Sequence, residues 1–178
     1  MRKAIAVLAV LAVLGAVVGG LVLTFVDVPG LLGTSAKVPA EYVSVVKKAA
    51  KRCPAVPANV LAAQIAAESG WDPKAESPAG AQGIAQFMPN VWDEHGVDAD
   101  GDGKASVWNP VDAIYAAADL NCVNAELVAD VPGDRLNNIL AAYNAGFNTV
   151  VKYDGVPPYP ETKAYVERIR ELSQRIQL

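Results

Sequence analysis

Histidine, cysteine and basic clusters are scarce in this sequence, and each scarcity argues against a class of function. His95 is the single histidine of the 178 residues, which argues against a histidine-ligated metal centre and a Ser–His triad. The net charge is −4, and no basic cluster follows Arg2 and Lys3, so nucleic acid is not an expected partner. Valine and isoleucine recur at helical rather than alternating spacing, and no internal repeat is present. These absences favour an all-α domain with short connections.

The N-terminal segment is a long uncharged apolar run. It extends from Ala4 to Val26, roughly 23 residues, which is long enough to span a bilayer. The preceding positive charges predict a cytoplasmic N-terminus and an exported remainder. A cleaved signal peptide is the alternative, with an imperfect site at Thr34-Ser35-Ala36, and no cysteine follows to allow lipoprotein processing. We therefore expect residues 1–26 to be an anchor or signal segment, 27–39 a linker and 40–178 one folded domain.

Glu68 is the carboxyl group on which the functional prediction rests. Apolar residues recur at helical spacing before it, Pro57 suits a first helical turn, and Gly70 suits the position just after the last turn. The negative end of the helix dipole and the apolar surroundings both disfavour the ionised form of Glu68 and raise its pKa. A carboxyl group that keeps its proton near neutral pH can act as a general acid. The alternative is an exposed glutamate at a frayed helix end.

The two cysteines lie on apolar faces of predicted helices. Cys53 closes a helix expected over about residues 41–52, and Cys122 lies on a helix expected over about residues 110–129. In an exported domain, two such cysteines most simply form one disulfide. On the chain-entropy model a loop of this length stabilises the fold by about 3–5 kcal/mol. Two buried free thiols are the alternative.

An aspartate-rich stretch indicates a calcium site. It matches the first half of an EF-hand loop, including the glycine at the sixth position: Asp98, Asp100, Asp102 and Gly103. Lys104 would offer its backbone carbonyl as the next ligand. The match then fails, because position twelve is Asn109 and the next acid is Asp112. An Asp/Gly turn without an ion is the alternative.

The remaining segments complete a helical chain. Residues 71–83 show little periodicity and are rich in glycine and proline, so their backbone could line a groove. A short helix is expected at residues 89–95. Further helices are expected to begin near Asp134, Asn148 and Glu161, with Gly146 as a left-handed stop after the first of them.

Four short motifs occur in one order along the chain: Glu68-Ser69, Gly83-Ile-Ala-Gln86-Phe-Met88-Pro89, Ala142-Tyr143-Asn144, and Glu161-Thr162 with Tyr165. Each motif is weak alone. Together, over residues 38–172, they resemble the soluble lytic transglycosylase family, whose catalytic domain has a goose-type-lysozyme-like helical fold. The chain looks like a small actinobacterial-type member. One departure is Ile84-Ala85, where many members have Leu-Met, and this change is conservative.

The resemblance implies an enzyme that cleaves the MurNAc–GlcNAc β-1,4 bond of peptidoglycan and forms 1,6-anhydro-MurNAc. The family's single catalytic acid matches Glu68, which would act first as acid and then as base, without a cofactor. The substrate-binding residues would be Ser77, Gln86, Met88, Tyr143, Asn144 and Glu161. We expect Asn144 also to fix a helix end, and Tyr143 to help stabilise positive charge on the sugar.

The aspartate-rich stretch further resembles the stretched EF-hand of the membrane-bound lytic transglycosylase B type, where the closing acid comes late. This second resemblance nominates Asp112 as a ligand of a structural Ca²⁺ together with Asp98, Asp100, Asp102 and Lys104.

Three alternatives remain open from the sequence. Hydrolysis by water, as in goose-type lysozymes, would use the same fold and the same acid. A calcium-stabilised wall-binding domain would be non-catalytic. A membrane-tethered component of a larger wall or secretion apparatus could coexist with activity. The expected partners are glycan strands and, through the N-terminal helix, the membrane, and we expect a monomer.

Overall fold

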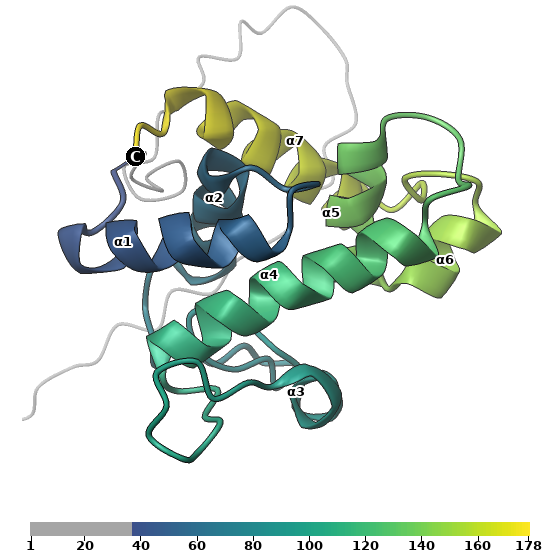
Figure 1. The fold of residues 1–178 in the computed structure, drawn as a ribbon. Coiled ribbons are helices and arrows are strands. Elements are labelled where there is room, and N and C mark those ends of the chain that lie inside the picture. Colours follow the sequence, from purple (N-terminus) through teal and green to yellow (C-terminus); the bar gives the residue numbers. More distant parts are fainter. Residues whose placement is uncertain (1–36) are drawn as a thin grey trace, which may run out of the picture. The chain divides into compact units, whose positions relative to one another are not determined.

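The computed structural model describes residues 37–178, and in this part of the chain helices alternate with loops (Figure 1). Extended backbone pairs there only in isolated bridges. The elements are α1 (Ala40–Ala49), η1 (Ala50–Arg52), α2 (Ala58–Ser69), α3 (Pro89–His95), α4 (Pro110–Leu127), α5 (Arg135–Ala145), α6 (Phe147–Lys152) and α7 (Pro160–Arg175). The predicted all-α class is confirmed. The predicted N-terminal anchor lies outside the described residues, and within them no helix has the length and apolarity needed to cross a membrane.

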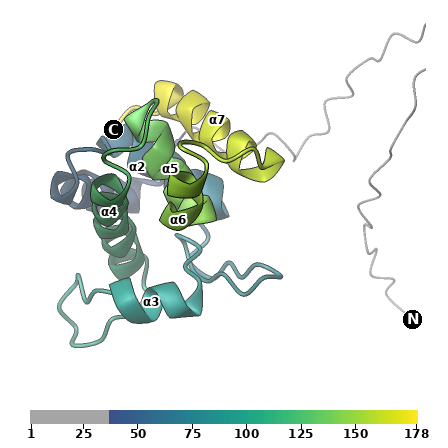
Figure 2. The ribbon, with the colours of Figure 1, turned by 90° about the vertical axis from the view of Figure 1, so that its right-hand side faces the viewer.

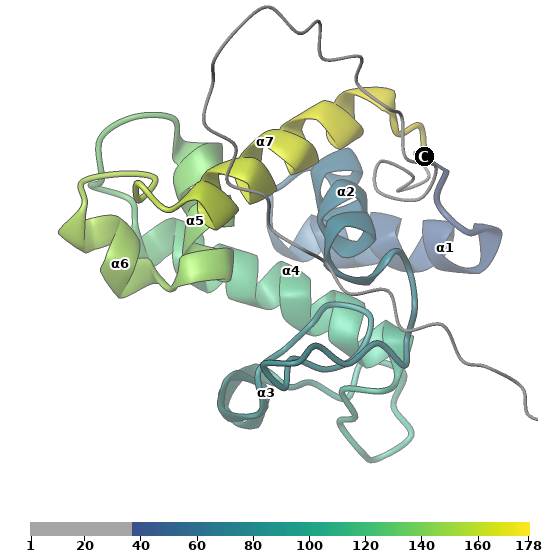
Figure 3. The ribbon, with the colours of Figure 1, turned by 180° about the vertical axis from the view of Figure 1, so that it is seen from behind.

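Helix α2 is the core helix that positions Glu68. Every residue from Val60 to Ala66 is buried and all but Gln64 are apolar, and a helix that is apolar on nearly all sides packs in the interior of a domain. It contacts α7 and α1 (Figure 3). Pro57 precedes its first turn, and Gly70 ends it in the left-handed conformation, with φ +65° and ψ +28°. The sequence therefore predicted both ends of this helix.

Helix α4 is the scaffold against which α1 and α5 pack. Its buried face is built largely from small side chains, which allow close approach of neighbouring helices: Ala113, Ala116, Ala117 and Ala118. Asn109 caps its first turn, because the side-chain Oδ1 accepts a hydrogen bond from the N–H of Val111 at 2.9 Å. Helix α3 and the loops beside it gather at the N-terminal end of α4 (Figure 2).

The junction between α5 and α6 differs from the prediction. Gly146 was expected to stop α5 in the left-handed helical conformation, but its φ is +81° and its ψ is +140°. This extended conformation with positive φ is open to glycine and strained for other residues. It lets Gly146 donate its N–H to Ala142 and then start α6 directly.

The two cysteines lie side by side where η1 meets α4. Both are free thiols in this structure. Burial and the neighbouring Cys122 thiol raise the pKa of Cys53 to about 12. Next to them, Nε and Nη2 of Arg52 each donate a hydrogen bond of 2.6 Å to the carboxylate of Asp119. The disulfide itself stays a prediction, now with both partners in place.

Candidate active site

Glu68 projects from the last turn of α2, where its carboxyl is surrounded by protein except at its cleft side. Burial raises the pKa of Glu68 to about 7. Two neighbours oppose this effect: the Tyr165 hydroxyl donates a hydrogen bond of 2.5 Å to Oε1, and the positive charge of Arg168 favours the carboxylate. The raised pKa expected from the apolar helix is confirmed, and burial is its main cause.

Two clefts meet at Glu68. One, of about 340 Å³, is lined by Ala67, Glu68, Asn144, Glu161, Ala164, Tyr165 and Arg168. The other, of about 330 Å³, is lined by Glu68, Ser77, Ala79, Ala81, Gln86, Met88, Tyr143, Asn144 and Glu161. The six predicted substrate-binding residues all line the second cleft, although they come from a loop, α5 and α7. A ligand in either cleft could therefore reach the carboxyl group.

The loop between α2 and α3 forms one wall of the second cleft and is held by its own side chains. Gln86, with φ +52°, donates from Nε2 to the carbonyls of Ala75 at 3.1 Å and Gly83 at 2.9 Å. Ser77 Oγ accepts a hydrogen bond of 3.0 Å from the N–H of Ala81. The amide nitrogen of Gln86 is thus used within the protein, and its oxygen is the atom left for a substrate.

The opposite wall comes from α5 and α7. Tyr143 donates its hydroxyl proton to the carbonyl of Ala85 at 2.9 Å, so its oxygen, a hydrogen-bond acceptor, is the atom available to a developing positive charge. Asn144 lies in the last turn of α5, and its expected role in fixing that helix end stays a prediction. Its Oδ1 accepts a hydrogen bond of 2.8 Å from the buried hydroxyl of Thr162, and this bond joins α5 to α7.

Several residues around Glu68 were not predicted as site residues. Tyr165 was named as part of the fourth motif without a role in the site, and Arg168 was not considered. Both fall at helical spacing from Glu161, at i+4 and i+7, so a helical-face analysis of α7 would have found them. Gln64, buried one turn before Glu68, is the only polar residue among the buried residues of α2, and this exception was a usable signal.

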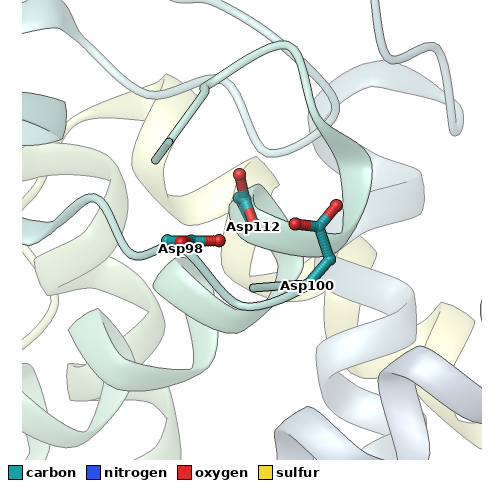
Figure 4. A group of neighbouring side chains, drawn as sticks. All are labelled: Asp98, Asp100 and Asp112. Carbon is teal, nitrogen blue, oxygen red and sulfur yellow. The ribbon is translucent and has the colours of Figure 1, made fainter. Parts of the chain in front are cut away.

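The aspartate-rich stretch brings together three of the predicted calcium ligands (Figure 4). One carboxylate oxygen from each of Asp98, Asp100 and Asp112 lies within 4.8 Å of the others. Asp112 is fully buried and accepts hydrogen bonds from the N–H groups of Ala99 and Ser106 at 2.8 and 3.1 Å. The ion pairs found among residues 37–178 all lie elsewhere, so this convergence of acids fits a bound cation.

The carboxylate of Asp102 lies outside this group, and the backbone carbonyl of Lys104 as a ligand stays a prediction. Asp102 Oδ1 accepts a hydrogen bond of 2.9 Å from the N–H of Lys104. Asn109, at position twelve of the loop, donates from Nδ2 to Asp100 at 2.7 Å and does not replace an acid. The late acid Asp112 therefore takes the position next to Asp98 and Asp100 that a closing ligand would need.

The fold and site define a lysozyme-like helical domain with one carboxylic acid of raised pKa where two clefts meet. The chain belongs to the Transglycosylase SLT domain family, whose sequence model matches residues 44–165. The soluble lytic transglycosylase Slt70 of Escherichia coli superposes with a TM-score of 0.62 at 23% identity, covering 77% of this chain and 24% of Slt70. Its complex with bulgecin A gives the same values. At this identity the likeness concerns the fold.

Two further relatives bear on the aspartate-rich stretch and on chain length. Escherichia coli Slt35, solved in complex with calcium, superposes with a TM-score of 0.56 at 16% identity, covering 76% of this chain and 70% of Slt35. A stretch of 40 residues is 50% identical to the membrane-bound lytic murein transglycosylase B of Escherichia coli (strain K12), covering 22% of this chain and 11% of the relative. The chain thus matches only a small part of that curated relative.

Proposed function

We propose that this domain is a peptidoglycan lytic transglycosylase in which Glu68 is first the acid and then the base. Neutral Glu68 donates its proton to the glycosidic oxygen as the bond between C1 of MurNAc and that oxygen breaks. The resulting carboxylate takes the proton of the MurNAc C6 hydroxyl, whose oxygen bonds to C1. The products are a GlcNAc-terminated strand and a 1,6-anhydro-MurNAc end. Glu68 regains its proton, and no water is consumed.

The observation that carries this proposal is the pKa of about 7 for Glu68 at the meeting point of two clefts. A carboxyl group with this pKa is present in both protonation states near neutral pH. It can therefore give up a proton in one step and accept one in the next. An exposed glutamate would be almost fully ionised at the same pH and would be a poor acid.

The surroundings of Glu68 support a reaction that uses one acid and a nucleophile from the substrate. The 2-acetamido group of MurNAc and the oxygen of Tyr143 would stabilise positive charge at C1. Glu161 lines both clefts, but the side-chain charge that acts on Glu68 is that of Arg168. We assign Glu161, Gln86, Ser77, Met88 and Asn144 to substrate binding.

Hydrolysis is the second candidate, and the position of Glu161 is the observation that favours it. Inverting glycosidases use a second carboxylate, several ångströms from the acid, to activate water. A carboxylate that shares both clefts with Glu68 could take that role. The two reactions differ in product: transglycosylation leaves a 1,6-anhydro end, and hydrolysis leaves a reducing MurNAc.

Mass spectrometry of muropeptides released from purified peptidoglycan tests the proposal. We expect 1,6-anhydro-MurNAc products, and we expect Glu68→Gln to lower the rate about a hundredfold or more. Glu171→Gln, an exposed substitution on α7, is the matched control and should act like the wild type. Reducing MurNAc ends would establish hydrolysis. A folded chain that binds glycan but releases no product would favour the non-catalytic wall-binding reading.

We also propose that Asp98, Asp100 and Asp112 hold a structural Ca²⁺. Support comes from their converging carboxylate oxygens, from the absence of an ion pair to them in the described chain, and from the calcium complex of the similarly folded Slt35. Hard oxygen ligands favour this ion. It would join the loop after α3 to the start of α4, far along the chain from Glu68, and would supply no step of the reaction.

The proposed substrate also fixes where the domain would work. Peptidoglycan lies outside the cytoplasmic membrane, so the apolar run from Ala4 to Val26 is proposed to export the domain and to anchor it in the membrane, or to be cleaved after export. An oxidising exterior would allow Cys53 and Cys122 to form their disulfide. This location can be tested by detecting the domain with an antibody in cell fractions prepared before and after protease treatment of the outer cell surface.

A further inference from the structure

A buried chain of hydrogen bonds runs from α4 through α2 to Glu68. Asn121, fully buried on α4, donates from Nδ2 to Oε1 of the fully buried Gln64 at 2.6 Å. Gln64 Nε2 lies 3.3 Å from the hydroxyl of Tyr165 and 3.5 Å from Asn121 Oδ1. The Tyr165 hydroxyl lies 2.5 Å from Glu68 Oε1. Four side chains from three helices thus form one network.

This network has one direction. An amide nitrogen only donates and an amide oxygen only accepts. In this structure Asn121 donates to the oxygen of Gln64, and the nitrogen of Gln64 therefore lies toward Tyr165. The Tyr165 oxygen must then accept from Gln64, and its own proton is committed to Glu68. If the Gln64 amide alone were reversed, its oxygen would compete with Glu68 for that proton and its nitrogen would face the nitrogen of Asn121.

We propose that Gln64 and Asn121 are positioning residues that hold the Tyr165 proton on Oε1 of Glu68, so that Oε2 carries the proton delivered to the glycosidic oxygen. This inference rests on the proposed role of Glu68 as the acid. Oε1 is occupied as an acceptor, so the neutral carboxyl has one favoured oxygen for its proton. After proton transfer, the same tyrosine proton stabilises the carboxylate that must act as base.

A purely structural role does not account for two amides at this place. Buried polar groups are costly unless paired, whereas an apolar pair of similar shape would fill the same space at no such cost. The neighbouring buried residues of α2 are all apolar. What the amide pair adds over an apolar pair is the fixed direction of the Tyr165 hydroxyl.

The other groups that face Glu68 are separate from this network. Arg168, on α7, acts through its positive charge and lowers the pKa of Glu68, and Glu161, also on α7, lines both clefts. Tyr143, on α5, gives its proton to Ala85. None of these three is hydrogen-bonded to Gln64 or Asn121 in the described structure, so substitution of the amide pair should act on Glu68 through Tyr165 alone.

The test is a carbon-13 NMR titration of the Glu68 carboxyl in the full chain, with the signal assigned by its loss in Glu68→Gln. In Gln64→Met the Tyr165 hydroxyl can turn and accept a hydrogen bond from the proton of neutral Glu68. The neutral form of Glu68 is therefore stabilised relative to the carboxylate. We expect the Glu68 pKa to rise by about half a unit or more. The alkaline limb of kcat/KM should move up by the same amount, because that limb reports loss of the acid's proton.

Two further variants separate positioning from stability. Gln64→Met with Asn121→Leu removes the orphaned amide, so it should regain the melting temperature lost in Gln64→Met and keep the raised Glu68 pKa. In a Tyr165→Phe background, Gln64→Met should cause no further shift. An unchanged Glu68 titration in the double variant, or an equal shift in both backgrounds, would overturn the inference.

The same measurements distinguish failure of the inference from failure of the proposed function. The NMR titration reads the carboxyl without turnover. If the wild-type chain releases no muropeptide but the Gln64 variants show the expected rise in the Glu68 pKa, the proposed reaction is contradicted and the positioning role is supported. If the wild-type chain is active but Gln64→Met leaves the Glu68 pKa unchanged, the proposed reaction is supported and the positioning role is contradicted.

Discussion

Gly83 packs directly against the backbone carbonyl of Val107: a Cβ at residue 83 would lie 2.1 Å from that oxygen. The φ of Gly83 is +73°, and its N–H donates a hydrogen bond of 2.9 Å to Ala75. This contact joins the loop that lines the second cleft to the segment just before α4. The glycine is therefore required here for space as well as for conformation.

Gly83→Ala should destabilise the domain by about 3 kcal/mol or more, because the added Cβ meets immobile backbone in a conformation that already disfavours side chains. Urea unfolding followed by circular dichroism measures the effect. Gly80→Ala is the matched control: its φ is +89°, but no atom lies within 4 Å of the added Cβ, so only about 1–2 kcal/mol is expected. Equal losses in the two variants would show that the Val107 contact is not the cause.

The stability of the domain should depend on the titration of Glu68. Burial raises the pKa of Glu68 from 4.5 to about 7 in the folded state, so the folded state binds this proton more tightly than the unfolded state. The favourable contribution is complete below pH 4.5 and is lost as pH rises through 7. Glu68→Gln, which cannot ionise, should exceed the wild type in stability at pH 8 by at most about 3 kcal/mol.

This difference should vanish below pH 4.5, where Glu68 is neutral in both states. Denaturant unfolding at a series of pH values measures it without any substrate. Glu171→Gln supplies the baseline for loss of an exposed carboxylate on α7. If the stability difference between the wild type and Glu68→Gln does not change from pH 4 to pH 8, the Glu68 carboxyl is not held neutral by burial.

Removal of calcium should lower the melting temperature of the wild-type chain. A ligand bound to the folded state at a hundred times its dissociation constant adds about 2.7 kcal/mol. We expect EDTA to remove this gain, excess Ca²⁺ to restore it, and Asp112→Asn to abolish the response. Asp130→Asn, at an exposed position after α4, should respond like the wild type. A melting temperature that EDTA does not change would show that no structural ion is bound.

Oxidation of Cys53 and Cys122 should stabilise the domain by about 4 kcal/mol, because the crosslink closes a long loop in the unfolded chain. Intact-mass spectrometry of protein from an oxidising compartment should show the loss of two hydrogens. A reductant should then lower the wild-type melting temperature and leave Cys122→Ala unchanged. If both thiols of the unfolded protein can still be alkylated after isolation from the oxidising compartment, the two cysteines are free and no disulfide is formed.

Local patterns explain what the sequence predicted well. The bounds of α2 and α3 follow from proline and glycine positions next to apolar periodicity, and such signals act within a few residues. The apolar helix around Glu68 also predicted the raised pKa, because desolvation depends on the immediate surroundings. The late closing acid Asp112 came from a resemblance to a known loop and not from spacing rules.

Pairings between distant elements could not be read in the same way. Asn144 bonds Thr162 on another helix, and nothing in the local sequence indicates that partner. Gln64 and Asn121 lie on different helices, and periodicity places both on buried faces without showing that they meet. The conformation of Gly146 was also missed, because a glycine signals positive φ but leaves ψ to the elements that it joins.

The loop that carries Gln86 has a consequence for how a glycan would be recognised. Its shape is fixed by bonds among its own residues and by Ser69, whose hydroxyl donates to the carbonyl of Ile84 at 2.7 Å. This wall is therefore already ordered in the folded protein, and a ligand does not have to order it on binding. The smaller entropic cost strengthens binding for a given set of contacts. Recognition in this groove would resemble a preformed template, with adaptation left to the flexible sugar strand.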